Sequence, residues 1–104
     1  MGVNYTWSGS ASYSRFLEEM GEIAKVFGAQ VRKTTEGVQY YVYYKPVPEA
    51  VVGWLNYPHV YFSPQQTKKI WEEVRQHPEI EEVSKQIWNE LEKCVEFEDG
   101  WYIH

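Results

Sequence analysis

The spacing of apolar residues changes along the chain, and each spacing predicts a different element. Val3, Tyr5 and Trp7 alternate with polar residues, which predicts a short strand followed by the loop SGSAS. Over residues 13–28 the apolar residues recur at helical spacing, after serines that can cap a helix. Gly28 is well placed as the left-handed residue that ends this helix. The chain therefore begins with a strand and an amphipathic helix.

Two strand-like runs, residues 29–34 and 38–45, flank the dipeptide Glu36-Gly37, which predicts a β-hairpin. The second run contains the stretch QYYVYYK, in which four tyrosines surround one valine. A two-residue turn separates the apolar from the polar side chains of the hairpin, whereas a three-residue turn mixes them. We therefore predict the two-residue turn, although glutamate is a mediocre first residue for it.

The two-residue turn assigns each tyrosine of the hairpin to a face. Because side chains alternate between the two faces of a strand, we expect Tyr40 and Tyr44 to face the core. The outward face then carries a polar set that includes two tyrosines: Gln30, Arg32, Gln39, Tyr41 and Tyr43. We expect this face to bind a protein or a second copy of the chain. The alternatives are a polar face that only contacts solvent and a platform on which nucleic-acid bases stack.

The rest of the chain is predicted to contain helices and several short elements. Prolines end the tyrosine strand and open an irregular insert, residues 46–62. Ser63, Pro64 and Gln66 are typical of a capped helix start. The predicted elements are a helix over residues 48–55, a strand over 59–62, helices over 63–76 and 79–94, and a hairpin through 98–100.

With the elements of the insert set aside, the order is β-α-β-β-α-α-β-β, which predicts a single domain over residues 1–104. The fold class is α+β, with an antiparallel sheet and helices on one of its faces. A ferredoxin-like arrangement with one appended strand fits the order. In that arrangement the tyrosine strand is central, and its outward face lies in the middle of an open sheet.

The charge of the chain is unevenly distributed. The net charge is −5, and residues 63–104 contain ten acidic and five basic residues. This acidity disfavours nucleic acid as a partner, because phosphate binding needs the opposite charge. It favours a basic protein partner, and the candidate acidic surface is formed by Glu79, Glu81 and Glu82.

Composition also bears on where the protein acts. Aromatic residues make up 17% of the chain, which is high for a small domain. The one cysteine, Cys94, cannot form an internal disulfide, and no signal peptide or apolar run of about 20 residues is visible. We therefore expect a cytoplasmic protein without a membrane segment.

The sequence contains no pattern typical of a catalytic, cofactor or metal site. The three histidines and Cys94 lack the spacing of metal ligands, and the single aspartate lies in a predicted turn. A candidate pocket is confined to the insert, where loops tend to carry function. Its residues are Glu49, Trp54, Tyr57 and His59. The alternative is that the insert only covers one edge of the core.

Together these features favour a small acidic interaction module without enzymatic activity, either of the inhibitor or adaptor type or one that forms homodimers. The alternative is a small-ligand or nucleotide-binding domain that uses the outward tyrosine face or the insert, residues 46–62. A deep apolar pocket with convergent polar groups would favour ligand binding. A flat aromatic patch with a polar rim would favour the interaction module.

Overall fold

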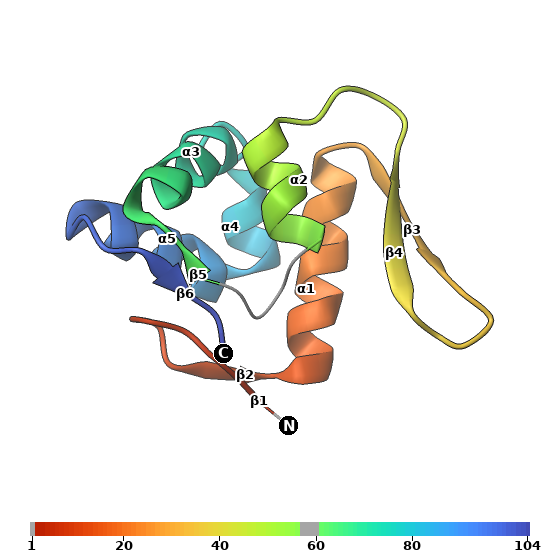
Figure 1. The fold of residues 1–104 in the computed structure, drawn as a ribbon, viewed down its shortest axis with the longest axis horizontal. Coiled ribbons are helices and arrows are strands. Elements are labelled where there is room, and N and C mark those ends of the chain that lie inside the picture. Colours follow the sequence, from red (N-terminus) through yellow and green to blue (C-terminus); the bar gives the residue numbers. More distant parts are fainter. Residues whose placement is uncertain (1, 57–60) are drawn as a thin grey trace.

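Five helices and three two-stranded antiparallel sheets form the regular structure of residues 2–56 and 61–104, the part of the chain that the computed structural model describes (Figure 1). The strands are β1 (Gly2–Asn4), β2 (Ser10–Ser12), β3 (Ala29–Lys33), β4 (Gln39–Tyr43), β5 (Tyr61–Phe62) and β6 (Trp101–Tyr102). The helices are α1 (Tyr13–Val26), α2 (Glu49–Asn56), α3 (Pro64–Val74), α4 (Glu79–Val83) and α5 (Lys85–Glu96). The predicted α+β class is confirmed.

The strands do not combine into the single sheet that was predicted. β1 pairs with β2, β3 with β4 and β5 with β6. In Figure 1 the β3–β4 hairpin lies on one side of α1, and the other two pairs lie near the chain ends. Because the last strand pairs with β5 at the end of the insert, it does not reach the tyrosine hairpin. The ferredoxin-like arrangement with a central tyrosine strand is therefore wrong.

The segment SGSAS, predicted as a loop, contains β2. Gly9 has a positive φ of 82°, and the N–H of Tyr5 donates to the carbonyl of Gly9 at 2.9 Å, so the chain reverses within a few residues. Val3 and Ala11 lie opposite each other in the register, and both are buried. The sequence pattern missed this strand because Ala11 is its one apolar residue.

The two ends of the described chain lie side by side. The backbones of Asn4 and His104 are joined by reciprocal hydrogen bonds of 2.6 and 3.1 Å. Nearby, the N–H of Tyr102 donates to Oγ1 of Thr6 at 3.2 Å. The N-terminal pair of strands is therefore joined edge to edge to the residues that follow β6.

The predicted starts and ends of two helices are confirmed. Oγ of Ser12 accepts from the backbone N–H of Arg15 at the start of α1, and Gly28 follows its end with a φ of 83°. At the start of α3, Ser63 and Gln66 form the reciprocal bonds of a capping box. These signals act through neighbouring residues, which explains why the sequence alone revealed them.

The helix predicted over residues 79–94 is interrupted at Ser84. This residue is extended, with φ −149° and ψ 95°. Its N–H donates to the carbonyl of Ile80 and ends α4, whereas its hydroxyl oxygen accepts from the N–H of Ile87 and begins α5. One buried serine therefore ends one helix and starts the next.

The hairpin predicted through residues 98–100 does not form. α5 continues to Glu96, and Glu98 then adopts a left-handed conformation with φ 56°. The chain leaves the helix there and enters β6, which pairs with β5. The apolar residues that suggested a hairpin strand, Val95 and Phe97, belong instead to the end of α5 and its cap.

The core lies among the helices and includes two buried tryptophans. Trp54 of α2 and Trp101 of β6 are fully buried, with ring centroids 5.3 Å apart. Phe62 of β5 packs against Trp101 at 5.9 Å. The apolar positions of the predicted helices supply much of the rest: Phe16, Met20, Ile23, Ala24, Phe27, Ile70, Val74, Ile80, Ile87, Leu91 and Cys94.

No helix among the described residues is long and apolar enough to cross a bilayer.

Glu90 lies inside this core and holds the N-terminal loop. Its side chain is fully buried. Its carboxylate oxygens accept hydrogen bonds from the backbone N–H groups of Thr6, Trp7 and Ser8 at 2.7, 2.8 and 2.9 Å, and from the hydroxyl of Ser8 at 2.9 Å. Consecutive N–H groups that converge on one anion form a nest, and here the anion is a side chain of α5.

A glutamate on a helix is by default expected to face solvent, but Glu90 is buried. A buried carboxylate is tolerated only when its oxygens are fully hydrogen-bonded. Gln86, one turn earlier on α5, strengthens the same contact by donating to the carbonyls of Ser8 and Ser10 at 2.7 and 3.1 Å. Two polar side chains of α5 thus fix the loop between β1 and β2.

Replacing Glu90 by Gln should destabilise the protein by about 2–4 kcal/mol, because charge-assisted bonds are lost and an amide N–H₂ group meets backbone donors. Urea unfolding measures the change. Glu92→Gln is the matched control, because Glu92 lies on the same helix and is exposed. A Glu90→Gln variant as stable as the Glu92→Gln control would show that the buried carboxylate does not hold the loop.

Cys94 adjoins the same carboxylate, with Sγ 3.7 Å from Oε2 of Glu90. Burial and the nearby charge of Glu90 raise the pKa of the Cys94 thiol from 9.0 to about 12. The unfolded chain therefore loses this proton first, and the stability that the neutral thiol confers should fall as pH rises from 9.0 to about 12. The free energy of unfolding of the wild type should therefore fall toward that of Cys94→Ala over this pH range. A constant difference would contradict the shift.

Candidate functional site: the β3–β4 hairpin

The β3–β4 hairpin projects from the body of the protein. In Figure 1 it runs beside α1, and its turn lies at the edge of the molecule, away from the other helices. On the side nearest α1, Ala29 is buried and Val31 partly buried. The hairpin is thus attached along one face, and its other face is directed away from α1.

The turn of the hairpin has three residues rather than two. Gly37 has a φ of 86° and donates its N–H to the carbonyl of Thr34 at 3.0 Å. The N–H of Thr34 donates to the carbonyl of Val38 at 2.9 Å, and its hydroxyl oxygen accepts from the N–H of Val38 at 3.1 Å. This pattern is that of a turn closed by a glycine bulge. The predicted two-residue turn is wrong.

Side chains of the turn favour this longer form. Hydrogen bonds from its own backbone N–H and from the hydroxyls of Thr35 and Thr34 lower the pKa of the Glu36 carboxyl. The glutamate that fitted poorly in a two-residue turn therefore has local donors in a three-residue turn. The run Thr34-Thr35-Glu36-Gly37 was the signal that could have revealed it.

The longer turn shifts the pairing of the strands by one residue. Val31 lies opposite Tyr41, and Arg32 lies opposite Tyr40. A shift of one residue exchanges the two faces of a strand, because side chains alternate. Tyr40 and Tyr44, predicted to be core residues, are therefore exposed by 42% and 64%.

The predicted outward set is divided between the two faces. Gln39, Tyr41 and Tyr43 face the body, and both tyrosines pack against the core. The side-chain amide of Gln39 donates to the Tyr41 hydroxyl at 3.2 Å and to the carbonyl of Leu17 at 3.4 Å. Burial raises the pKa of Tyr41 and of Tyr43 above that of a free tyrosine. Gln30 is exposed as predicted.

The hairpin face, as we call the outward surface of the hairpin, is formed by Gln30, Arg32, Tyr40, Val42 and Tyr44. Arg32 donates from Nε and Nη2 to Oε1 of Gln30 at 3.0 and 2.8 Å, and from Nη2 to the Tyr44 hydroxyl at 2.5 Å. The Tyr44 hydroxyl donates in turn to Oε1 of Gln30 at 3.0 Å. These bonds hold the guanidinium group in a defined position on an exposed aromatic surface.

The hairpin also differs in charge from the rest of the chain. Its residues 29–45 include three basic side chains, Arg32, Lys33 and Lys45, and one acidic side chain, Glu36. Their net charge of +2 contrasts with −5 for the whole chain. Arg32 is the one charged residue on the hairpin face, and Lys33 belongs to the opposite face of the same strand.

The candidate acidic surface lies elsewhere on the molecule. Glu79, Glu81 and Glu82 are all exposed in the short helix α4. Glu79 approaches Nδ1 of His77 at 3.4 Å. The structure thus presents the three carboxylates to solvent, and their role in binding a partner stays a prediction.

Of the four residues of the candidate pocket in the insert, the structure describes two, Glu49 and Trp54. Trp54 is fully buried in the core, whereas Glu49 is exposed at the start of α2. Tyr57 and His59 lie outside the described residues. Glu49 does line a hollow of about 350 Å³ between α2 and α3, together with Gln66 and Lys69. Its other walls include Phe62 and Ile70.

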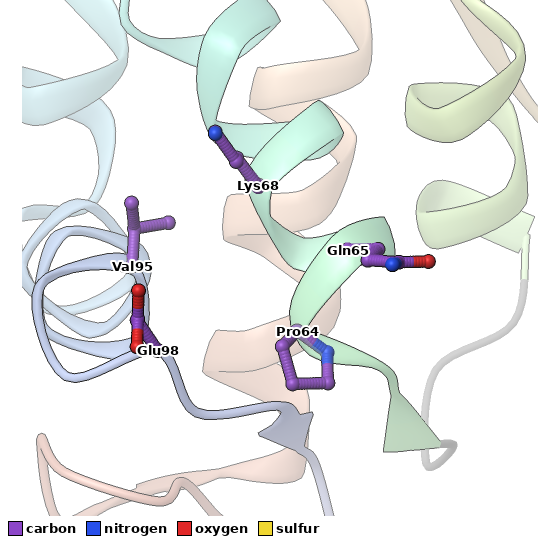
Figure 2. A pocket seen from close by; sticks show the side chains of 5 residues that line it. All are labelled: Pro64, Gln65, Lys68, Val95 and Glu98. Carbon is purple, nitrogen blue, oxygen red and sulfur yellow. The ribbon is translucent and has the colours of Figure 1, made fainter.

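A smaller hollow of about 290 Å³ lies between the start of α3 and the end of α5 (Figure 2). Lys68 and Gln65 of α3 form one side, and Val95 and Glu98 form the other. Its polar side chains are few and of mixed charge. No group of three metal-ligating side chains occurs among the residues that the structure describes.

Comparison of the chain with protein family models, with curated proteins and with solved structures found no match. The hairpin face is therefore the candidate site on its own geometry. It combines projection from the body, an ordered arginine and two exposed tyrosines.

The exchange of faces predicts which tyrosines the fold needs. Tyr41→Ala should cost about 2–3 kcal/mol, because it removes a partly buried aromatic ring. Tyr44→Ala should cost about 1 kcal/mol or less, because the ring is mostly exposed. Urea unfolding at several protein concentrations separates these losses from any effect of association. Equal losses for the two variants would contradict the register.

Proposed function

We propose that the protein is a small protein-interaction module and that the hairpin face is its binding surface. The observation that carries this proposal is the hydrogen-bonded trio of Gln30, Arg32 and Tyr44, exposed on a hairpin that extends from the body. Arginine and tyrosine are enriched among the residues that contribute most to protein interfaces. We place this activity in the cytoplasm, which is consistent with a single unpaired cysteine.

The Arg32 side chain is already ordered in the free protein, and this favours binding through the hairpin face. Long side chains lose conformational freedom when they enter an interface, and this loss weakens binding. Arg32 already bonds to Gln30 and Tyr44, so part of its freedom is lost on folding. Its guanidinium group has five N–H donors, and those not used within the trio remain to meet a partner.

The charge of the hairpin indicates the chemistry of the partner. A face whose one charge is Arg32, on a hairpin of net charge +2, is complementary to carboxylates or to an acceptor-rich acidic surface. The body of the same chain is strongly acidic and would repel an acidic partner elsewhere. The two effects together direct such a partner to the hairpin.

Arg32→Ala should weaken binding of the partner by roughly 10- to 100-fold, as truncation of an arginine at the centre of an interface does. Proteins retained from an extract of the source cells by the immobilised wild type supply the partner, which is then titrated against each variant. Lys33→Ala is the matched control, because it removes the same charge from the same strand on the opposite face.

Partner binding should also weaken as salt rises, because exposed charges are screened. If Arg32→Ala and Lys33→Ala bind equally well, the hairpin face is not the binding surface. If Arg32→Ala and Lys33→Ala both fold and bind normally, and Glu81→Lys abolishes binding, the acidic surface on α4 is the site instead.

A further inference from the structure

The outer edge of β4 lacks the features that usually protect an edge strand. Within the described residues, β4 pairs with β3 and with no other strand. Residues 38–44, VQYYVYY, contain no charge and no proline, and most of them favour extended structure. Natural edge strands are commonly blocked by charges, prolines or bulges. An unblocked edge of this composition is a template for another strand.

The turn determines which backbone groups this edge presents. Thr34 donates to the carbonyl of Val38, so these residues form a hydrogen-bonded pair. Hydrogen-bonded and non-hydrogen-bonded pairs alternate along an antiparallel ladder, so the N–H and C=O groups of Gln39, Tyr41 and Tyr43 point away from β3. Among the described residues, no backbone hydrogen bond joins these groups to another element.

The neighbouring helices leave room beside this edge. A hollow of about 560 Å³ lies between the hairpin and the helices α1 and α2. Its walls include Tyr13 and Leu17 of α1, Leu55 of α2, and Val38 and Tyr41 of the hairpin. The described residues of the body therefore leave unfilled space beside Val38, Gln39 and Tyr41.

We infer that two copies of the chain pair along β4, antiparallel and about a two-fold axis at Tyr41, to form a continuous four-stranded sheet. With Tyr41 opposite its own counterpart, Gln39 lies opposite Tyr43 of the second copy. The outward N–H and C=O groups of these residues then bond reciprocally, since all three point from the same edge. The strand is thus complementary to itself in its backbone.

The same register is complementary in its side chains. On the hairpin face it places Tyr40 opposite Val42 of the second copy, and Tyr44 opposite Val38. Pairs of aromatic and β-branched residues are favourable across antiparallel strands. Val38, Tyr40 and Tyr44 are 62%, 42% and 64% exposed in the single chain. The pairing therefore brings together the large apolar side chains that the hairpin exposes.

The self-complementary register favours a second copy over a strand of another protein, and no charge at the junction opposes the pairing. No like charges meet at the junction, because residues 38–44 are uncharged and Arg32 and Lys33 lie on β3, away from it. A two-fold interface of this kind also closes on itself and does not propagate into fibres. The dimer joins two hairpin faces into one surface and leaves Arg32 of each copy accessible.

Two double variants test the register directly. Tyr40→Glu with Val42→Glu sets like charges opposite each other at both symmetric pairs, and should weaken dimerisation by roughly tenfold or more. Tyr40→Glu with Val42→Lys sets opposite charges there and should restore much of the affinity. Both variants change the same two neighbouring positions, so they serve as controls for each other. Sedimentation velocity across the micromolar to millimolar range gives the dissociation constants.

Amide hydrogen exchange of the wild type provides a second, independent measurement. The amides of Gln39, Tyr41 and Tyr43 should exchange quickly in the dilute monomer and slowly at high concentration. The amides of Tyr40 and Val42 bond to β3 and should be protected at every concentration.

A chain that stays monomeric throughout the range overturns the inference, as does a dimer whose three edge amides still exchange quickly. Protection of these amides only when another protein is added would mean that the edge accepts a foreign strand, and would also overturn it. None of these results bears on Arg32→Ala, so the proposed partner-binding function is judged separately.

Discussion

The buried carboxylate of Glu90 is the interaction on which the arrangement of the chain ends depends. It gathers three successive N–H groups of the loop between β1 and β2, and thereby fixes β1 against α5. The residues after β6 then bond to Asn4 and Thr6 of that same region. A carboxylate in the interior is costly unless its oxygens are satisfied. Here several donors satisfy it, so a charge within the core becomes a fixed point between segments more than 80 residues apart.

This fixed body has a different physical character from the hairpin that it carries. The core of the body contains large buried side chains, including Trp54 and Trp101. The β3–β4 hairpin, in contrast, packs through one face only and leaves tyrosines in solvent. Rigid scaffolds that present less buried segments are a common arrangement for binding, because affinity requires accessible groups in defined positions. The two parts of the chain thus differ in burial: the body supplies most of the buried core, and the hairpin supplies exposed aromatic and polar groups.

Signals that act between near neighbours in the sequence were predictable. The capping box at Ser63 and the stop at Gly28 both act within a few residues, and both were found. The spacing of Glu90 from Ile87 and Cys94 places it on the buried face of α5, but its hydrogen-bond donors lie in a distant loop, which no local pattern brings to it. The pairing of β6 with β5 is likewise a long-range choice. The hairpin was predicted, but its register depended on one residue of turn length, so its candidate site was assigned to the wrong face of β4.

The turn at Thr34–Val38 has a consequence for how such a surface can change during evolution. Most substitutions in β4 alter one side chain and leave its neighbours in place. Loss of a single residue from the turn, however, would move the whole strand by one position and present Tyr41 and Tyr43 to solvent in place of Tyr40 and Tyr44. Both faces of the strand are rich in tyrosine, so either register would expose tyrosines. Deletion of one codon in the turn would therefore be enough to change which face of β4 is exposed.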